Sequence, residues 1–144
     1  MRVARPILGV VLVAMALGQA SNLSAFVEIV GTYDLGGETI ARISSAALLI
    51  GELVGGVGLL ARRRQAAPIA VIVAAAWTIV GVQAFARGLD VPNCGCFGTH
   101  LSQPLRWWVL VQDAEFVALA WWVRRRWPAS TPDPRPADDL AVAQ

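Results

Sequence analysis

Four blocks of apolar residues constrain this chain more than any other feature. The blocks run from Ile7 to Val27, from Ile40 to Leu60, from Pro68 to Ala86 and from Leu105 to Val123. Each approaches the roughly 20 residues that a helix needs to cross a hydrocarbon core of about 30 Å. With 56% hydrophobic and only 15% charged residues, the chain keeps little length for a soluble catalytic domain. The sequence therefore predicts an all-α protein, a four-helix transmembrane bundle over residues 1–127.

The arginines predict how this bundle is oriented. Nine of the twelve basic residues precede the first block, join the second to the third, or follow the fourth. Because basic residues favour the cytoplasmic side, both termini are expected inside and the other two connections outside. We expect a multi-pass protein of the bacterial cytoplasmic membrane. The net charge of +2 then reflects topology, so no nucleic-acid partner is expected.

The two ends of the chain need separate interpretation. Residues 128–144 are rich in proline and lack an apolar period, which predicts a disordered cytoplasmic tail. Met1 to Ala20 also has the basic start and short apolar stretch of a cleavable signal peptide. An uncleaved span is favoured because the apolar character continues to Val27.

Both cysteines lie in one short turn, Cys94-Gly95-Cys96, which is followed by Phe97 and Gly98 in the third connection. Two residues of extended chain span up to about 7 Å, whereas bridged cysteines have Cα atoms roughly 4.4 to 6.8 Å apart. A disulfide closes here only if the turn bends, and Gly95 permits that bend. The small ring closed by a Cys94–Cys96 disulfide should be strained. Such a bond suits disulfide exchange better than stabilisation of the fold.

The cysteine pair is compatible with three uses. A metal site is poorly supported, because His100 is the one histidine and the set supplies at most three of the usual four ligands. A structural disulfide would remove little entropy from the unfolded chain. Thiol–disulfide exchange with a partner is therefore favoured. His100 either stabilises a thiolate or is a solvated loop residue, which is the more common case.

Three acidic residues fall inside the blocks, where a charge is costly and therefore indicates function. Glu52 lies near the middle of the second block, and Asp113 and Glu115 lie in the fourth. They either hydrogen-bond between helices or handle protons during thiol oxidation or quinone reduction. Both interpretations stay open for Glu52, and hydrogen bonding is favoured for the other two. A quinone is thus a candidate electron carrier, although no quinone motif is visible.

These features resemble the MauE family of methylamine-utilisation membrane proteins, often grouped with DoxX-like redox-associated proteins. The resemblance rests on the order of the four spans, on the Glu-x-x-x-Gly from Glu52 to Gly56, and on the Cys-Gly-Cys-Phe-Gly string that starts at Cys94. It implies that Cys94 and Cys96 form a redox pair and that Glu52 is a buried acid. It also implies a thioredoxin-like partner and a role in maturing the disulfide-rich small subunit of periplasmic methylamine dehydrogenase. Family members often carry Arg-Asn where this chain has Gln112-Asp113.

The favoured function is a membrane thiol–disulfide redox protein that serves an extracytoplasmic thioredoxin-like protein or a disulfide-containing substrate. If the protein is an enzyme, it is a membrane thiol–disulfide oxidoreductase. The alternatives are a non-enzymatic assembly or scaffold subunit and a small transporter component that uses Glu52 and Asp113. The candidate catalytic residues are Cys94, Cys96 and Glu52, and the supporting residues are Gly95, Phe97, Gly98, His100 and Asp113.

Overall fold

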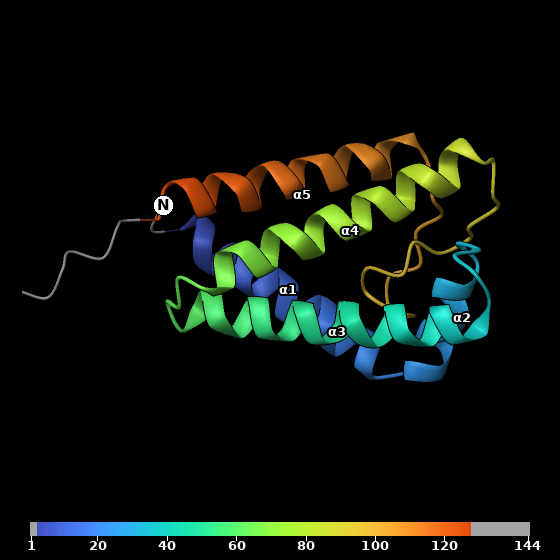
Figure 1. The fold of residues 1–144 in the computed structure, drawn as a ribbon, viewed down its shortest axis with the longest axis horizontal. Helices are drawn as coiled ribbons and strands as arrows, with labels where there is room; N and C mark the ends of the chain where they lie inside the picture. The colour runs from blue at the N-terminus through green and yellow to red at the C-terminus, as the bar shows by residue number, and fades with distance from the viewer. Residues whose placement is uncertain (1–2, 128–144) are drawn as a thin grey trace, which may run out of the picture.

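The computed structural model describes residues 3–127, which fold into five helices and no strand (Figure 1). The helices are α1 (Ala4–Ala20), α2 (Leu23–Gly31), α3 (Glu38–Leu60), α4 (Ala66–Ala86) and α5 (Trp107–Arg125). The predicted all-α fold is confirmed for this part of the chain. The predicted tail, 128–144, lies outside the described residues.

The four long helices lie side by side, with α3 packed on α1 and α4, and α4 packed on α5. Figure 1 shows the short α2 at one end of this bundle, where the connection from α4 to α5 also folds back between the helices. Small residues allow the close approach of α3 to its neighbours. A Cβ added at Gly56 would lie 2.9 Å from the Gly9 carbonyl oxygen of α1, and one added at Gly51 would lie 2.7 Å from Val73 of α4. Glycine at these positions lets the backbones approach closely.

The predicted single helix from Ile7 to Val27 is wrong, because the chain bends inside it. Helix α1 ends at Ala20, and α2 leaves it at an angle of 99°. Asn22 starts the new helix: its side-chain oxygen accepts a hydrogen bond from the Ala25 amide at 3.2 Å, the usual N-cap contact. The apolar residues after Asn22 therefore cover the end of the bundle and do not extend α1.

Two of the helices in residues 3–127, α3 and α4, are long and apolar enough to cross a membrane. The bent pair α1 and α2 makes a third candidate if it counts as one span. Helix α5 falls outside this group, since its 19 residues include Asp113, Glu115, Arg124 and Arg125. The chain is thus a membrane protein with two or three candidate spans, and the four-span topology stays a prediction.

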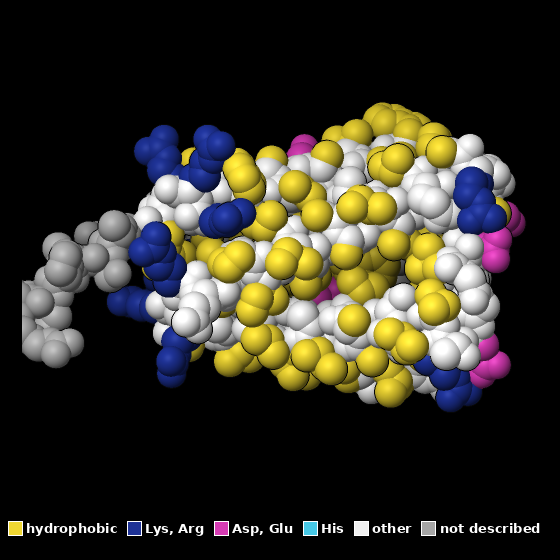
Figure 2. Space-filling view, in the orientation of Figure 1, with side chains coloured by type: hydrophobic (Ala, Val, Ile, Leu, Met, Phe, Trp, Pro, Cys, Tyr) yellow, Lys and Arg dark blue, Asp and Glu magenta, His cyan; other side chains and the backbone are white. Residues whose placement is uncertain are grey.

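Most charged side chains gather at the two ends of the bundle, and apolar side chains cover most of its length, where a few acidic side chains also show (Figure 2). One end carries mainly arginine, and there α1 and α4 begin and α3 and α5 end. The other end is mixed, with ion pairs from Arg42 to Glu38 and from Arg87 to Asp34. An apolar side surface between charged ends is what a bilayer requires.

Candidate functional site

The cysteine turn is folded into the bundle and is not an exposed surface loop. Gly95 has a φ of +82°, a conformation that favours glycine, so the bend expected from the sequence is present. Cys94 is only 4% exposed and Cys96 is half-buried. Cys94 is therefore shielded, whereas Cys96 is partly accessible.

Side chains from distant parts of the chain hold this turn in place. The Tyr33 hydroxyl donates to the Cys94 carbonyl oxygen at 2.9 Å, and the Gln19 side-chain amide donates to the Cys96 carbonyl oxygen at 3.1 Å. The Cys94 amide donates to the Gln103 carbonyl oxygen at 2.7 Å. Neither Gln19 nor Tyr33 was predicted from the sequence. Gln19 carried a usable signal, because a polar side chain within an apolar block has the same cost that singled out Glu52.

Two glycines bring the turn against α1, backbone to backbone. A Cβ added at Gly98 would lie 2.5 Å from the Gly18 carbonyl oxygen, and one added at Gly18 would lie 2.7 Å from the Phe97 carbonyl oxygen. Gly98 also has a φ of +62°. Gly98, which the sequence predicted as a supporting residue, thus lies where the cysteine turn contacts α1.

The two thiols are adjacent and chemically unequal. Their sulfur atoms lie 3.7 Å apart, within hydrogen-bonding distance, and both cysteines are free. The hydrogen bond from Cys96 lowers the pKa of Cys94 to about 7, against a usual value of 9.0. The same hydrogen bond and burial raise the pKa of Cys96. Cys94 is consequently the thiol that loses its proton first.

This asymmetry predicts how alkylation depends on pH. The reactive thiolate of Cys94 is present above its pKa and is lost as the pH falls, so iodoacetamide labelling of Cys94 should rise through about pH 7. In Cys96→Ala the stabilising hydrogen bond is absent, and the midpoint should move up towards 9.0. Mass spectrometry of the labelled peptide measures both profiles. Identical midpoints in the two proteins would contradict the role given to Cys96.

Glu52 lies fully buried in α3 and is connected to the turn. Its Oε1 accepts a hydrogen bond from the Trp77 ring nitrogen of α4 at 2.7 Å, and the Gln19 side chain lies beside its carboxyl group. Among the described residues, Glu52 Oε2 and Gln19 Oε1 have no hydrogen-bond partner. The Gln19 amide nitrogen is already engaged with Cys96, so a proton on Glu52 Oε2 would satisfy both oxygens. Glu52 bonds to Trp77 and Gln19 bonds to the cysteine turn, and these two hydrogen-bonded pairs lie side by side within the bundle.

Asp113 of α5 lines a cavity of about 190 Å³ together with both cysteines. Its charge is unpaired within the described part of the chain, where ion pairs join only Arg42 to Glu38 and Arg87 to Asp34. The cavity walls include both thiols, the carboxyl group and three aromatic rings: Cys94, Cys96, Asp113, Trp77, Phe97 and Phe116. Glu115 is exposed on the opposite side of α5 and does not take part.

His100 lies away from the thiols. It is exposed, and its Nε2 lies 2.7 Å from the Ser21 hydroxyl oxygen at the corner between α1 and α2. The contact fastens the end of the cysteine turn to that corner. Within residues 3–127, no three His, Cys, Asp or Glu side chains are placed to share a metal ion.

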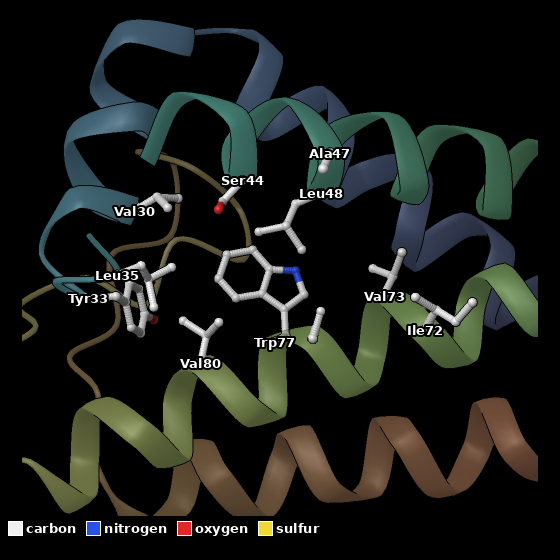
Figure 3. A pocket seen from close by; sticks show the side chains of 11 residues that line it. Val30, Tyr33, Leu35, Ser44, Ala47, Leu48, Ile72, Val73, Trp77 and Val80 are labelled. Atoms are coloured by element: carbon white, nitrogen blue, oxygen red, sulfur yellow. The ribbon is translucent and has the colours of Figure 1, made fainter. Parts of the chain in front are cut away.

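A second cavity, of about 250 Å³, lies between α3 and α4 on the other side of Trp77 (Figure 3). Its walls are apolar apart from Ser44 and Tyr33. Trp77 lines both cavities, so its indole ring separates this chamber from the thiols. No thiol or carboxyl group faces the second cavity, and the reactive groups therefore concentrate in the first.

Comparison with known proteins identifies the family. The family model described as methylamine utilisation protein MauE matches residues 1–124. The chain belongs to the MauE family. A relative of this MauE-family chain, the methylamine utilization protein MauE of Paracoccus denitrificans, is 29% identical over 135 residues, which cover 89% of this chain and 70% of the relative. No solved structure matches. The resemblance inferred from the sequence is confirmed, and membership indicates an accessory membrane protein of methylamine utilisation.

Proposed function

We propose that this MauE-family protein exchanges disulfides, through Cys94 and Cys96, with an extracytoplasmic thioredoxin-like protein or a disulfide-containing substrate. The exchange supports maturation of a secreted protein of methylamine metabolism, such as the dehydrogenase small subunit. The observation that carries the proposal is the pair of free thiols 3.7 Å apart in a glycine-bent turn, one with a lowered and one with a raised pKa.

The unequal thiols assign a role to each cysteine. In the oxidised protein, a partner thiolate attacks the Cys96 sulfur, which is the more exposed of the two. The Cys94 thiolate leaves, because a thiol of lower pKa is the better leaving group. A second partner thiol then attacks the mixed disulfide, so that the partner gains a disulfide and the pair is left as two thiols. Cys96 is therefore the contact cysteine. In the reverse reaction, the Cys96 thiolate attacks a disulfide of the oxidised partner, and Cys94 resolves the mixed disulfide by attacking the Cys96 sulfur and releasing the partner as a dithiol.

Trapping the mixed disulfide tests this proposal. Cys94→Ser cannot form its own disulfide, so its Cys96 can join only an oxidised partner by attacking the partner's disulfide. Because Cys94 is missing, no thiol of the protein resolves this mixed disulfide, and a larger, reductant-sensitive species that contains the partner should accumulate on a non-reducing gel. Cys96→Ser should trap less, because the remaining Cys94 is 4% exposed. The double variant is the control and should trap nothing. If neither single variant traps a partner and the double variant still supports maturation, a scaffold role replaces exchange.

We further propose the bacterial cytoplasmic membrane as the location, with both termini inside and the cysteine turn on the outer side. Cys94 is shielded and Cys96 is half-buried, so introduced cysteines at exposed positions are better reporters. In a Cys94→Ser, Cys96→Ser background, an impermeant maleimide should label Glu38→Cys in intact cells and Arg63→Cys only after lysis. Both positions are exposed and lie at opposite ends of α3. The reverse labelling pattern would invert the topology.

A further inference from the structure

The cavity beside the thiols combines features that no other described cavity shares. Cys94 and Cys96 line it together with Asp113, and the aromatic residues Trp77 and Phe116 belong to its walls. Its volume of about 190 Å³ suits a single small ring system and not a folded partner. Since Cys94 is 4% exposed, a ligand that reaches both sulfurs has to be small and apolar.

We propose that this cavity binds the ring of a membrane quinone, which oxidises the Cys94–Cys96 dithiol. The inference rests on the proposed exchange function, which leaves the pair reduced after each cycle and so requires an acceptor of two electrons and two protons. A quinone is planar and lipid-soluble and accepts both. The aromatic and aliphatic walls fit its ring faces, and the carboxyl group of Asp113 fits a ring oxygen.

The packing of the bundle provides a path from the lipid. Helix α1 packs mainly on α3, and α5 packs mainly on α4, so the seam between α1 and α5 is thinly packed. Val11 of α1 and Phe116 of α5 line the cavity from the two sides of this seam. A lipid-soluble ring can therefore approach from the side, while the protein partner approaches Cys96 from the end of the bundle.

The redox step balances within the cavity. The Cys94 thiol gives its proton to Asp113 and becomes a thiolate. The two sulfurs then form one S–S bond and release two electrons to the ring. Asp113 returns the first proton to one ring oxygen, and the proton of the Cys96 thiol goes to the other. Dithiol and quinone thus become disulfide and quinol.

Single-turnover oxidation tests the inference. Purified protein in detergent is reduced, freed of reductant under anaerobic conditions and mixed with ubiquinone-1. We expect one quinone reduced per chain and the loss of both free thiols. Val11→Phe, which fills the thiol cavity, should slow the reaction at least about tenfold. Ala76→Phe is the matched control, since it fills the other cavity and should react at the normal rate.

A second variant guards against a folding defect in the first. Asp113→Asn preserves side-chain size, so it should keep the thermal unfolding midpoint yet slow oxidation, and it should lower the pKa of Cys94, which the Asp113 charge raises. Equal rates in Val11→Phe, Ala76→Phe and the parent protein would overturn the quinone site. Partner trapping without quinone reduction would defeat this inference alone. Quinone reduction without trapping would defeat the proposed exchange function alone.

Discussion

Glu52→Leu should destabilise the folded protein by about 2–4 kcal/mol, because it strands the buried Trp77 ring nitrogen and leaves Gln19 without its neighbour. Glu52→Gln should keep most of the stability, since an amide oxygen can accept from Trp77 and an amide nitrogen can donate to Gln19. Unfolding in detergent, followed by circular dichroism, measures both. Glu115→Leu is the matched control and should change little, because Glu115 is exposed.

The same pair of variants separates structure from mechanism at Glu52. The proposed redox step uses only Asp113 and the two thiols, so a proton-handling role for Glu52 is a separate prediction. Glu52→Gln cannot exchange a proton, and thiol oxidation should slow although the protein is folded and present in the membrane. Full activity in Glu52→Gln and Glu52→Leu, at equal membrane abundance, would remove Glu52 from the mechanism.

Gly98→Ala should undock the cysteine turn. Its Cβ would need a positive φ that costs about 1–2 kcal/mol, and it would lie 2.5 Å from the Gly18 carbonyl oxygen, so the two backbones must separate. We expect a total loss of about 2–4 kcal/mol in unfolding free energy. Cys94, now exposed, should be alkylated at least about tenfold faster at a pH where its thiolate is fully formed.

Gly88→Ala is a close control for this change. Gly88 lies in the same connection with a φ of +66°, but nothing lies within 4 Å of its added Cβ. It should show the conformational cost alone, with slow alkylation of Cys94. Equal alkylation rates in Gly88→Ala and Gly98→Ala would show that the contact with Gly18 does not hold the turn.

The sequence predicted the long helices closely, because their length is set by a local property. The expected blocks 40–60 and 68–86 became Glu38–Leu60 and Ala66–Ala86, and 105–123 became Trp107–Arg125. The break at Asn22 was missed because the apolar residues on both sides of it hide a helix start. Only the Asn22 side chain, which caps α2, marks that start. Asn22 caps a helix here because α2 can pack on the end of the bundle.

The reactive residues of the candidate site were predicted from the sequence, but the residues that contact them were not. The spacing of Cys94 and Cys96, and the need for Gly95 to bend, are local facts that the sequence contains. The contacts that bury the turn join residues 61 and 77 positions apart, Tyr33 to Cys94 and Gln19 to Cys96, and periodicity carries no information about such pairs. The partner of Glu52 was also out of reach, since nothing in the largely apolar block from Pro68 to Ala86 marks Trp77 as facing the second block.

The 99° corner after Ala20 has a consequence for the surrounding bilayer. Helix α1 has 17 residues, a length of about 25 Å at about 1.5 Å per residue, which is less than the hydrocarbon thickness of roughly 30 Å. A protein with this hydrophobic mismatch either thins the adjacent leaflet or keeps its corner below the headgroups. In the second case the cysteine turn, which docks on the last turn of α1, lies among acyl chains, and lipid chain length becomes a physical variable of the thiol chemistry.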